Sequence, residues 1–226
     1  MLTKKGIMKK VCFVAVISVL LCACAGKTGQ AKGEVDEQKI VLFNGEDLSN
    51  CDFLVNFDEA PAEQVFSVQD GLIHIAGSPF GYMYTKEQYG DYKLHVEWRW
   101  PDGPSNSGIF LLIAEPNNPL PNGIECQLQS GNAGDFIALG GSDLLEYVTP
   151  EGQERPMYPG ISKQNESSEN PVGEWNEADI EVMDGVITVY INGVLQNKGT
   201  NVVKQGHIGL QSEGHDIEFR NVYLTK

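Results

Sequence analysis

Apolar and polar residues alternate in short runs along most of the chain, and turn signals separate the runs. From Lys93 to Trp100 every second residue is apolar, the period of a strand with one buried face. Residues 109–113 form a continuous apolar run, which is typical of a strand covered on both faces. Turn signals recur roughly every eight to twelve residues, and no segment shows a long helical period. The pattern predicts an all-β fold in which two sheets form a sandwich.

Pairs of turn residues mark the expected hairpins. Asp-Gly and Asn-Gly supply the positive φ angles that two-residue turns need. The first pair is Asp70-Gly71, within residues 66–75. The second is Asp184-Gly185, between expected strands at 178–182 and 186–191, and Asn192-Gly193 follows the latter strand directly. Expected strands at 207–211 and 216–224 complete the chain.

Residues 140–173 do not share this pattern. They contain four prolines, many glycines and acidic residues, and no clear strand. A loop of this length in a compact domain is usually functional or disordered. We expect it to form a wall or lid of a binding groove and to carry Arg155, Tyr158 and Lys163 to it.

The N-terminal segment predicts the compartment. Lys9 and Lys10 precede an apolar run at 11–22, too short to span a bilayer comfortably and typical of a signal peptide. The run ends in a sequence that resembles a bacterial lipobox, with Cys24 as the acylated residue. We therefore predict a lipoprotein signal peptide at 1–23, the lipidated cysteine and a flexible tether at 24–39, and one domain at 40–226. The expected location is the outer membrane of the cell envelope, facing the periplasm.

Charge narrows the choice of partner. The chain has 31 acidic and 16 basic residues, and residues 1–23 contain four lysines and no acid, which leaves 12 basic residues after cleavage. Such an acidic chain argues against binding nucleic acid, and against membrane contact other than through the N-terminal lipid. Cys51 and Cys126 remain besides Cys24. An oxidising compartment would allow these two cysteines to pair, but because Cys126 shares an apolar strand face, we expect it to be a buried free thiol.

The segment 123–136 carries the candidate chemistry. Ile124, Cys126 and Leu128 alternate with polar residues, so the opposite face of this strand presents a carboxylate and two amides. That face is either a solvated surface or the floor of a groove for a polyhydroxylated ligand. The polar residues are Glu125, Gln127 and Gln129, and a glycine-rich turn then brings Asp135 near the end of their row.

A series of short motifs resembles one known family. The motifs are Phe43-Asn44-Gly45, Asp47-Leu48-Ser49, Asp70-Gly71-Leu72, Tyr89-Gly90-Asp91-Tyr92, Glu97-Trp98-Arg99, Asn106-Ser107-Gly108-Ile109, Gly123-Ile124-Glu125-Cys126-Gln127, Gly173-Glu174-Trp175-Asn176, Ile191-Asn192-Gly193, Ile208-Gly209-Leu210-Gln211-Ser212 and Phe219-Arg220-Asn221-Val222. In this order they resemble the 3-keto-disaccharide hydrolase domain family, also described as 3-keto-glucoside 1,2-lyase or 3-keto-2-hydroxyglucal hydratase domains. The resemblance implies a concanavalin-like antiparallel jelly roll, secretion, and action on glycosides oxidised at carbon 3.

The residues themselves suggest how such a site would work. Ordinary glycoside hydrolysis uses two carboxyl groups, but amides stand beside Glu125 where a second would be expected. A ketone at carbon 3 acidifies the hydrogen at carbon 2, so one base with a raised pKa and an enolate stabiliser are enough. Glu125 is the expected base, with its pKa raised by desolvation. The stabiliser is Arg99, Lys163, His215 or a divalent cation such as Ca²⁺.

Several residues have both a functional and a structural interpretation. Glu97, Glu125 and Asp135 could supply oxygen ligands to a cation, but no metal-ligand spacing is visible and no cofactor is predicted with certainty. Asp135 is either a catalytic acid or a turn cap, and His215 lies in a turn. The predicted substrate-binding residues are Glu97, Arg99, Asn106, Ser107, Gln127, Gln129, Lys163 and Trp175. Some of them also have a structural interpretation. Glu97 and Arg99 could form a surface pair, Asn106 and Ser107 could begin a turn, and Trp175 could plug the end of the sandwich.

Two classes of function remain open. The preferred one is an envelope enzyme that cleaves 3-keto-glycosides by hydrolysis, or by elimination and hydration. The alternative is a non-catalytic carbohydrate-binding lipoprotein on the same jelly roll, because a fold does not fix a function. A standard glycosidase with Glu125 and Asp135 as its carboxyl pair is a third interpretation.

Overall fold

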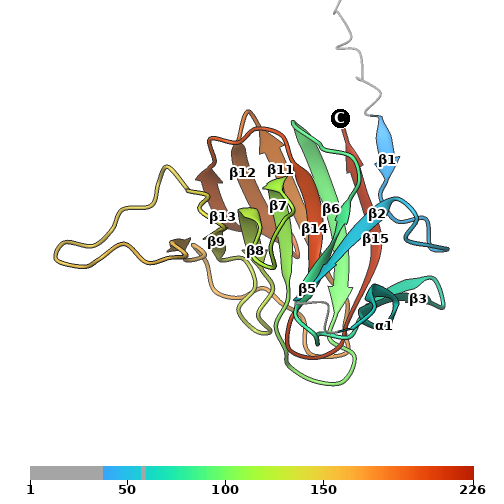
Figure 1. The fold of residues 1–226 in the computed structure, drawn as a ribbon. Helices are drawn as coiled ribbons and strands as arrows, with labels where there is room; N and C mark the ends of the chain where they lie inside the picture. The colour runs from blue at the N-terminus through green and yellow to red at the C-terminus, as the bar shows by residue number, and fades with distance from the viewer. Residues whose placement is uncertain (1–37, 57–59) are drawn as a thin grey trace, which may run out of the picture. The chain divides into compact units, whose positions relative to one another are not determined.

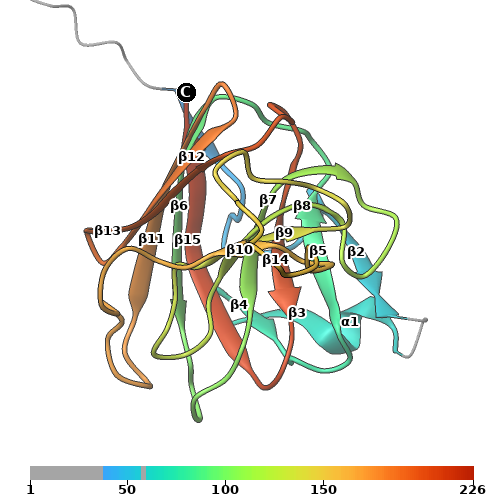
Figure 2. The same cartoon turned by 90° about the vertical axis from the view of Figure 1, so that its left-hand side faces the viewer.

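The structure is a computed structural model that describes residues 38–56 and 60–226. In this part of the chain nearly all regular structure is β-strand, arranged in two antiparallel sheets that pack face to face (Figures 1 and 2). One short helix, α1 (Ala62–Val65), is found in these residues. The prediction of an all-β sandwich is confirmed. The predicted signal peptide, Cys24 and most of the predicted tether lie outside the described residues.

Sheet A contains eight strands and includes both ends of the described chain. In spatial order they are β13 (Val194–Thr200), β12 (Val186–Ile191), β11 (Asn176–Met183), β6 (Tyr92–Arg99), β15 (Ile217–Thr225), β4 (Leu72–Ile75) and β3 (Phe66–Gln69), with β1 (Lys39–Val41) paired to the end of β15. Gln38 and Lys226 exchange backbone hydrogen bonds of 3.2 and 3.3 Å. The described chain therefore starts and ends side by side.

Sheet B contains seven strands. In spatial order they are β10 (Gly160–Ile161), β9 (Phe136–Leu139), β8 (Asn122–Gln127), β7 (Gly108–Glu115), β14 (His207–Ser212), β5 (Gly81–Thr85) and β2 (Cys51–Val55). The neighbours β7 and β14 are far apart in the sequence, so the face of this sheet is assembled from distant segments.

The core lies between the two sheets and uses the apolar residues predicted from the alternation. Leu94, Val96 and Trp98 of β6 are at most 1% exposed and pack in one cluster with Ile124 and Cys126 of β8. The opposite side of each strand therefore faces outward from its sheet. Cys51 and Cys126 are both buried and free, so the prediction of a buried free thiol at 126 is confirmed.

The predicted hairpins form where the turn pairs occur. Asp70, Asp184 and Asn192 have φ angles of 51°, 50° and 48°, each followed by a glycine that also has positive φ. The strands β2, β5 and β9 were not predicted. Their sequences do not alternate clearly because apolar residues lie on both faces, as in the Tyr-Met-Tyr run of β5.

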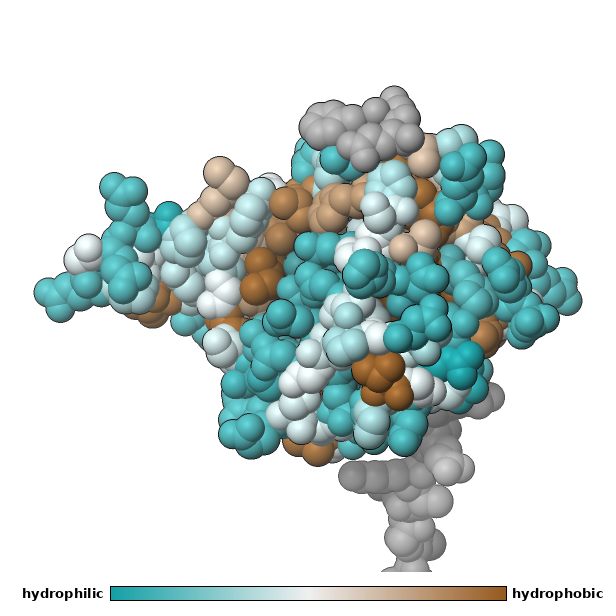
Figure 3. Space-filling model, turned by 90° about the horizontal axis from the view of Figure 1, so that it is seen from below, coloured by the Kyte–Doolittle hydropathy of each residue, from teal (hydrophilic) through white to brown (hydrophobic). Residues whose placement is uncertain are grey.

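The long segment after β9 forms one short strand, β10. Residues 148–158 project from the body of the sandwich in Figures 1 and 3, with exposed apolar side chains at Val148 and Met157 among hydrophilic ones. The end of β10 and the residues after it are hydrogen-bonded to β13. Asn197 Nδ2 donates to Ile161 O at 2.8 Å, and Gln164 N donates to Gln196 O at 2.6 Å. This part of the segment closes the side of the sandwich between β9 and β13.

Candidate functional site

Glu125 lies on the outer face of sheet B and is buried there. Its neighbours Ile124 and Cys126 point into the core, so its own side chain points away from it, yet it is only 4% exposed. Directly opposite it in the sheet are Phe110 of β7 and Ile137 of β9. These apolar neighbours remove water from the carboxyl group. Glu125 therefore does not face bulk water, and within the described residues it forms no ion pair.

A second apolar cluster covers part of this outer face. Tyr82, Phe110 and Leu139 form it, with Leu120 of the β7–β8 loop packed against them. The loop is held in place because the Tyr82 hydroxyl donates to Asn118 O at 3.1 Å. The cluster contains Phe110 and has Ile137 packed against it, and these two residues flank Glu125 in the sheet, so the cluster contributes to the exclusion of water from the carboxyl group.

Gly108 provides the space that the Glu125 carboxyl group occupies. It lies on β7 opposite Gln127, next to Phe110 on the same face. A Cβ atom at position 108 would lie 2.4 Å from Glu125 Oε1 and 2.9 Å from its Cγ. Real Cβ atoms do not approach that closely, so the absence of a side chain at 108 creates the niche.

Unpartnered oxygen atoms surround this niche. Gln211 follows Leu210, which pairs with Ile109, so β14 brings Gln211 beside Gly108. Asn106 forms an isolated bridge with Glu213 two positions further along these strands, on the same face of the sheet. Four acceptor oxygens are buried without a hydrogen-bond partner: Glu125 Oε1, Gln127 Oε1, Gln211 Oε1 and Asn106 Oδ1. Because buried polar atoms are normally paired, this set is suited to a ligand that brings several hydroxyl donors.

The electrostatics favour a neutral carboxyl group at position 125. Burial, and then the negative charge of Glu213, raise the pKa of Glu125 to about 8. The expectation that desolvation raises this pKa is therefore met. Such a group exchanges a proton near neutral pH, as a general acid or base must.

Sequence reasoning missed Glu213 and Gln211. Gln211 lies near the end of β14 and Glu213 directly follows that strand; both come close to Glu125 only because β14 pairs with β7, about a hundred residues earlier in the chain. The strand period of 2 places Gln211 on the face opposite Leu210, which is the local signal that was available. That period does not say which strand is the neighbour.

Asp135 lies beside the row but holds a loop. Its carbonyl oxygen accepts from Gln127 N at 2.9 Å, so it does lie at the end of the polar row. Its carboxylate accepts from the backbone N–H of Lys163 at 2.8 Å and from Asn132 Nδ2 at 3.5 Å. Lys163 Nζ donates to Asn132 Oδ1. These bonds give Asp135 and Lys163 a structural role in tying two loops together.

The other predicted site residues near sheet B are Ser107, Gln129 and His215, and they differ in how exposed they are. Ser107 is fully buried and its hydroxyl donates to Gln211 O at 2.8 Å, so in this structure it joins β7 to β14. Gln129 is exposed. His215 is exposed in the β14–β15 turn and lines a surface pocket of about 260 Å³ with Asp102, Gly103 and Asp216.

Glu97, Arg99 and Trp175 lie on the outer face of sheet A, not with Glu125. The single groove expected from the sequence is therefore wrong. Both β6 and β8 turn their apolar faces toward the shared core, so their polar faces point in opposite directions. For the same reason Glu97 and Glu125 cannot share one cation. Among residues 38–56 and 60–226, no group of three or more His, Cys, Asp and Glu side chains could hold a metal ion.

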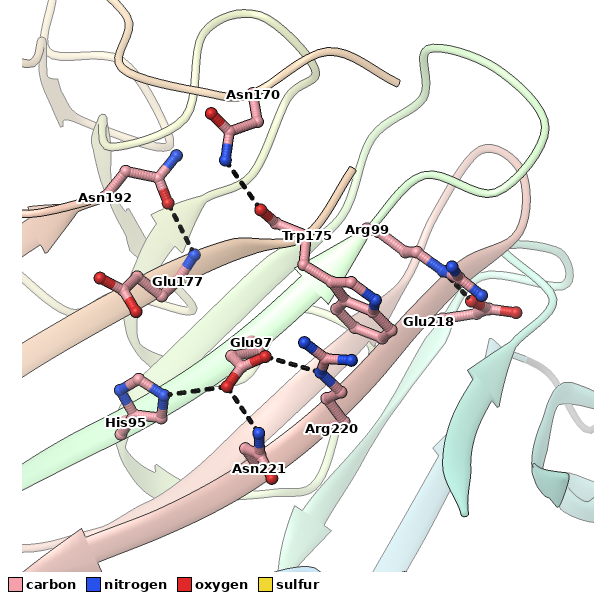
Figure 4. Close-up of polar contacts among 10 residues, drawn as sticks. All are labelled: His95, Glu97, Arg99, Asn170, Trp175, Glu177, Asn192, Glu218, Arg220 and Asn221. Atoms are coloured by element: carbon pink, nitrogen blue, oxygen red, sulfur yellow. Dashed lines mark hydrogen bonds and ion pairs between the residues drawn. The ribbon is translucent and has the colours of Figure 1, made fainter. Parts of the chain in front are cut away.

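The residues on sheet A form a network of their own (Figure 4). Glu97 accepts from Arg220 Nε and from Asn221 Nδ2, both at 2.6 Å, while Arg99 pairs with Glu218. Partial burial alone would raise the pKa of Glu97, but the bonds from Asn221 and Arg220 outweigh it and lower that pKa. Glu97 is therefore an ionised cross-strand partner.

Fold and site together describe a jelly-roll sandwich that carries a buried, protonatable carboxyl group on the outer face of one sheet. The family model of the 3-keto-alpha-glucoside-1,2-lyase-like domain matches residues 38–225. The chain belongs to this family, as the sequence motifs indicated. In the described residues, no helix is long and apolar enough to cross a membrane.

Solved structures with the same fold include enzymes and a binding module. A protein from Parabacteroides distasonis ATCC 8503, assigned as a glycosyl hydrolase, is 20% identical with a TM-score of 0.59, over 83% of this chain and 93% of its own. The carbohydrate binding module CBM66 from Bacillus subtilis is 10% identical with a TM-score of 0.56, over 76% and 93%. The catalytic domain of an endo-1,3-beta-glucanase (laminarinase) from Thermotoga petrophila RKU-1 is 12% identical with a TM-score of 0.53, over 84% and 97%. A comparison with curated proteins gave no match.

Proposed function

We propose that this domain cleaves 3-keto-glycosides, with Glu125 as the base that removes the hydrogen at carbon 2. One observation carries the proposal: the Glu125 carboxyl group, with a pKa of about 8, occupies the space that Gly108 leaves free, among the unpartnered amide oxygens of Gln127, Gln211 and Asn106. Membership of a family named for a 3-keto-alpha-glucoside lyase supports the choice of substrate.

The chemistry requires one proton transfer at a time. The ketone at carbon 3 makes the neighbouring hydrogen acidic, and ionised Glu125 takes it while the electron pair moves to the ketone oxygen as an enolate. The enolate then reforms the ketone and expels the glycosidic oxygen from carbon 1, which leaves a double bond between carbons 1 and 2. The departing oxygen takes up a proton, from Glu125 or from water, and leaves as an alcohol. Addition of water to that double bond completes a net hydrolysis. The acceptor oxygens of Gln127, Gln211 and Asn106 are suited to holding the sugar hydroxyls during these steps.

Replacement of Glu125 by glutamine tests the role of the base. Glu125→Gln keeps the shape of the side chain but cannot take a proton, so we expect turnover of a 3-keto-disaccharide to fall by at least ~10³-fold while binding changes only a few-fold. The measurement is product formation by chromatography, with the unoxidised disaccharide as the second substrate.

The matched control is Glu181→Gln, an exposed carboxylate on β11 of the other sheet. It should retain wild-type turnover. Full activity of Glu125→Gln would remove Glu125 from the role of base.

A non-catalytic carbohydrate-binding function is the second candidate. The four unpartnered acceptor oxygens favour it, because they fit sugar hydroxyls whether or not a reaction follows. Under this alternative the wild-type protein binds oxidised and unoxidised disaccharides and turns over neither.

We also propose that the mature protein is a lipoprotein of the outer membrane, facing the periplasm. The support is the basic start, short apolar run and lipobox-like sequence that end at Cys24. Expression in a bacterial host with labelled palmitate tests it. The wild-type chain should incorporate label and enter the detergent phase, whereas Cys24→Ala should do neither. Equal labelling of both forms would contradict the proposal.

A further inference from the structure

Three acceptor groups gather at one end of the niche, on neighbouring strands of sheet B. Asn106 and Glu213 form an antiparallel bridge, so they lie directly opposite each other and on the same face of the sheet. Gln211 precedes Glu213 by two residues, which places it on that face as well, about 6–7 Å along the strand. This is the outer face, on which Gly108 and the Glu125 carboxyl group also lie. Side chains of this length can therefore bring their oxygens to one ligand group.

None of the three groups has a hydrogen-bond donor. Gln211 is 1% exposed, and its Oε1 is buried without a partner, as is Asn106 Oδ1. The carboxylate of Glu213, which is partly exposed, forms no hydrogen bond and no ion pair with any described residue. Because buried polar atoms are normally paired, two such oxygens beside a free carboxylate call for a ligand group that only donates.

The charge at this end of the niche is negative and uncompensated by the described residues. Lys163 Nζ donates to Asn132 Oδ1, and Arg99 lies on the outer face of sheet A, where it pairs with Glu218. The charge of Glu213 instead acts on Glu125 and contributes to its raised pKa. A ligand with a positive charge would therefore be favoured here.

The turn after Glu213 fixes the three groups relative to one another. His215 N donates to Ser105 Oγ at 2.6 Å, and a Cβ atom at Gly214 would lie 2.5 Å from the same oxygen. Ser105 O also accepts from Ser130 N at 2.9 Å. The turn is thus packed directly against the residue before Asn106, so little backbone ordering is left for a ligand to bring about.

We propose that this end of the niche binds a primary ammonium group, and that the substrate is a glycoside that carries an amino group. An ammonium group has three N–H donors and no acceptor, so it matches Asn106 Oδ1, Gln211 Oε1 and the Glu213 carboxylate. A hydroxyl group has one donor and would leave the charge of Glu213 uncompensated. Gln127 Oε1 remains for a hydroxyl group of the same ligand.

A metal ion fits these groups less well than an ammonium group. Among residues 38–56 and 60–226, no group of three or more His, Cys, Asp and Glu side chains could hold one. Two neutral amide oxygens and one partly exposed carboxylate are few ligands for a hard divalent cation, which takes six or more oxygens. The inference rests on the proposed function in one respect, that the ligand of the niche is a glycoside.

Titrations with glucose, glucosamine and 6-amino-6-deoxyglucose, followed by NMR, test the proposal. They are performed at about pH 6, where a sugar amine is protonated. The side-chain amide signals of Asn106 and Gln211 should shift and saturate with at least one amino sugar, at a Kd about tenfold or more below that for glucose. None of these sugars is oxidised at carbon 3, so the result does not depend on turnover.

Three variants locate the binding of the amino group. Glu213→Gln keeps the shape of the side chain and removes its charge, so it should abolish the preference for the amino sugar. The matched control Glu181→Gln removes one negative charge from an exposed position on sheet A and should keep the preference. Asn106→Asp keeps an acceptor oxygen and adds a charge, so it should strengthen binding of the amino sugar but not of glucose.

The inference is overturned if neither amino sugar binds the wild-type protein more tightly than glucose, or if Glu213→Gln and Glu181→Gln bind the amino sugar equally well. It is also overturned if CaCl₂ at ~10 mM displaces the amino sugar while NaCl of equal ionic strength does not, because the oxygens would then form a metal site. Turnover of a 3-keto-disaccharide is measured separately. A preference for the amino sugar without turnover would contradict the proposed function and leave this inference standing.

Discussion

At the scale of single residues, the environment of Glu125 decides what the carboxyl group can do. An isolated carboxylate on an exposed sheet face would be ionised and solvated at neutral pH. Here Phe110 and Ile137 exclude water from it, and Glu213 adds a like charge nearby. The strand period was enough to predict that Glu125 faces away from the core. It could not predict the burial, which depends on neighbouring strands from other parts of the sequence.

The raised pKa makes the stability of the fold depend on pH. The ordinary value of this carboxyl group is 4.5 and its value in the folded chain is about 8, so between these pH values the folded chain binds the proton more tightly than the unfolded chain. The free energy of unfolding should therefore fall as the pH rises through this range, by a few kcal/mol. Glu125→Gln should lack this component. Urea denaturation of both proteins at pH 5 and pH 9 measures it, and parallel pH dependences would contradict it.

The pH dependence of activity should report the same group. A base must be ionised, so kcat/KM for a 3-keto-disaccharide should rise with pH and level off above about 8. Glu213→Gln removes the neighbouring negative charge and should move the rising limb to lower pH. Glu181→Gln is the control, because it lies on the other sheet. A profile that Glu213→Gln leaves in place would show that Glu213 does not influence the base.

At the scale of strands, the niche depends on a glycine facing a glutamate across β7 and β8. Gly108 belongs to one of the motifs in the sequence, but its role becomes visible only when β7 and β8 are paired. The hairpins, in contrast, could be predicted because Asp-Gly and Asn-Gly act within a few residues. The strand period also assigned Glu97 and Glu125 correctly to polar faces. It could not say that these faces belong to different sheets, and for this reason one groove was expected where the residues lie on two opposite faces of the sandwich.

Gly108→Ala should displace the Glu125 carboxyl group. Its new Cβ would come within 2.4 Å of Glu125 Oε1, so the side chain must move out of the niche. We expect turnover to fall by about a hundredfold or more, since small displacements of a catalytic group are costly. Circular dichroism should show that the fold is retained. Gly103→Ala, where nothing lies within 4 Å of the added atom, should keep full activity.

At the scale of the whole molecule, the core is apolar but holds a few unpaired polar atoms. Tyr92 is 2% exposed, and its hydroxyl is buried without a partner, whereas the hydroxyl of Tyr82 donates to Asn118 O. Burial raises the pKa of Tyr92 above its usual range, so it stays neutral. The two tyrosines thus provide a matched pair for measuring what an unsatisfied hydroxyl costs.

Tyr92→Phe should leave the free energy of unfolding unchanged or raise it by about 1 kcal/mol, because it removes an unpaired buried group. Tyr82→Phe should lower it by about 1 kcal/mol, because it removes a hydrogen bond and leaves Asn118 O without its donor. Urea denaturation of the two variants gives both values. A greater loss in Tyr92→Phe than in Tyr82→Phe would contradict this account.

The adjacency of Gln38 and Lys226 has a consequence for how the chain can be connected. Because backbone hydrogen bonds already join these two positions, a short linker could close them into a ring without disturbing either sheet. New ends could then be opened between Glu151 and Gly152, which are exposed in the projecting segment. We expect such a circularly permuted domain to fold to the same sandwich, with Glu125 and Gly108 still facing each other. In such a protein the order of the strands along the gene would change while their order in the sheets would not.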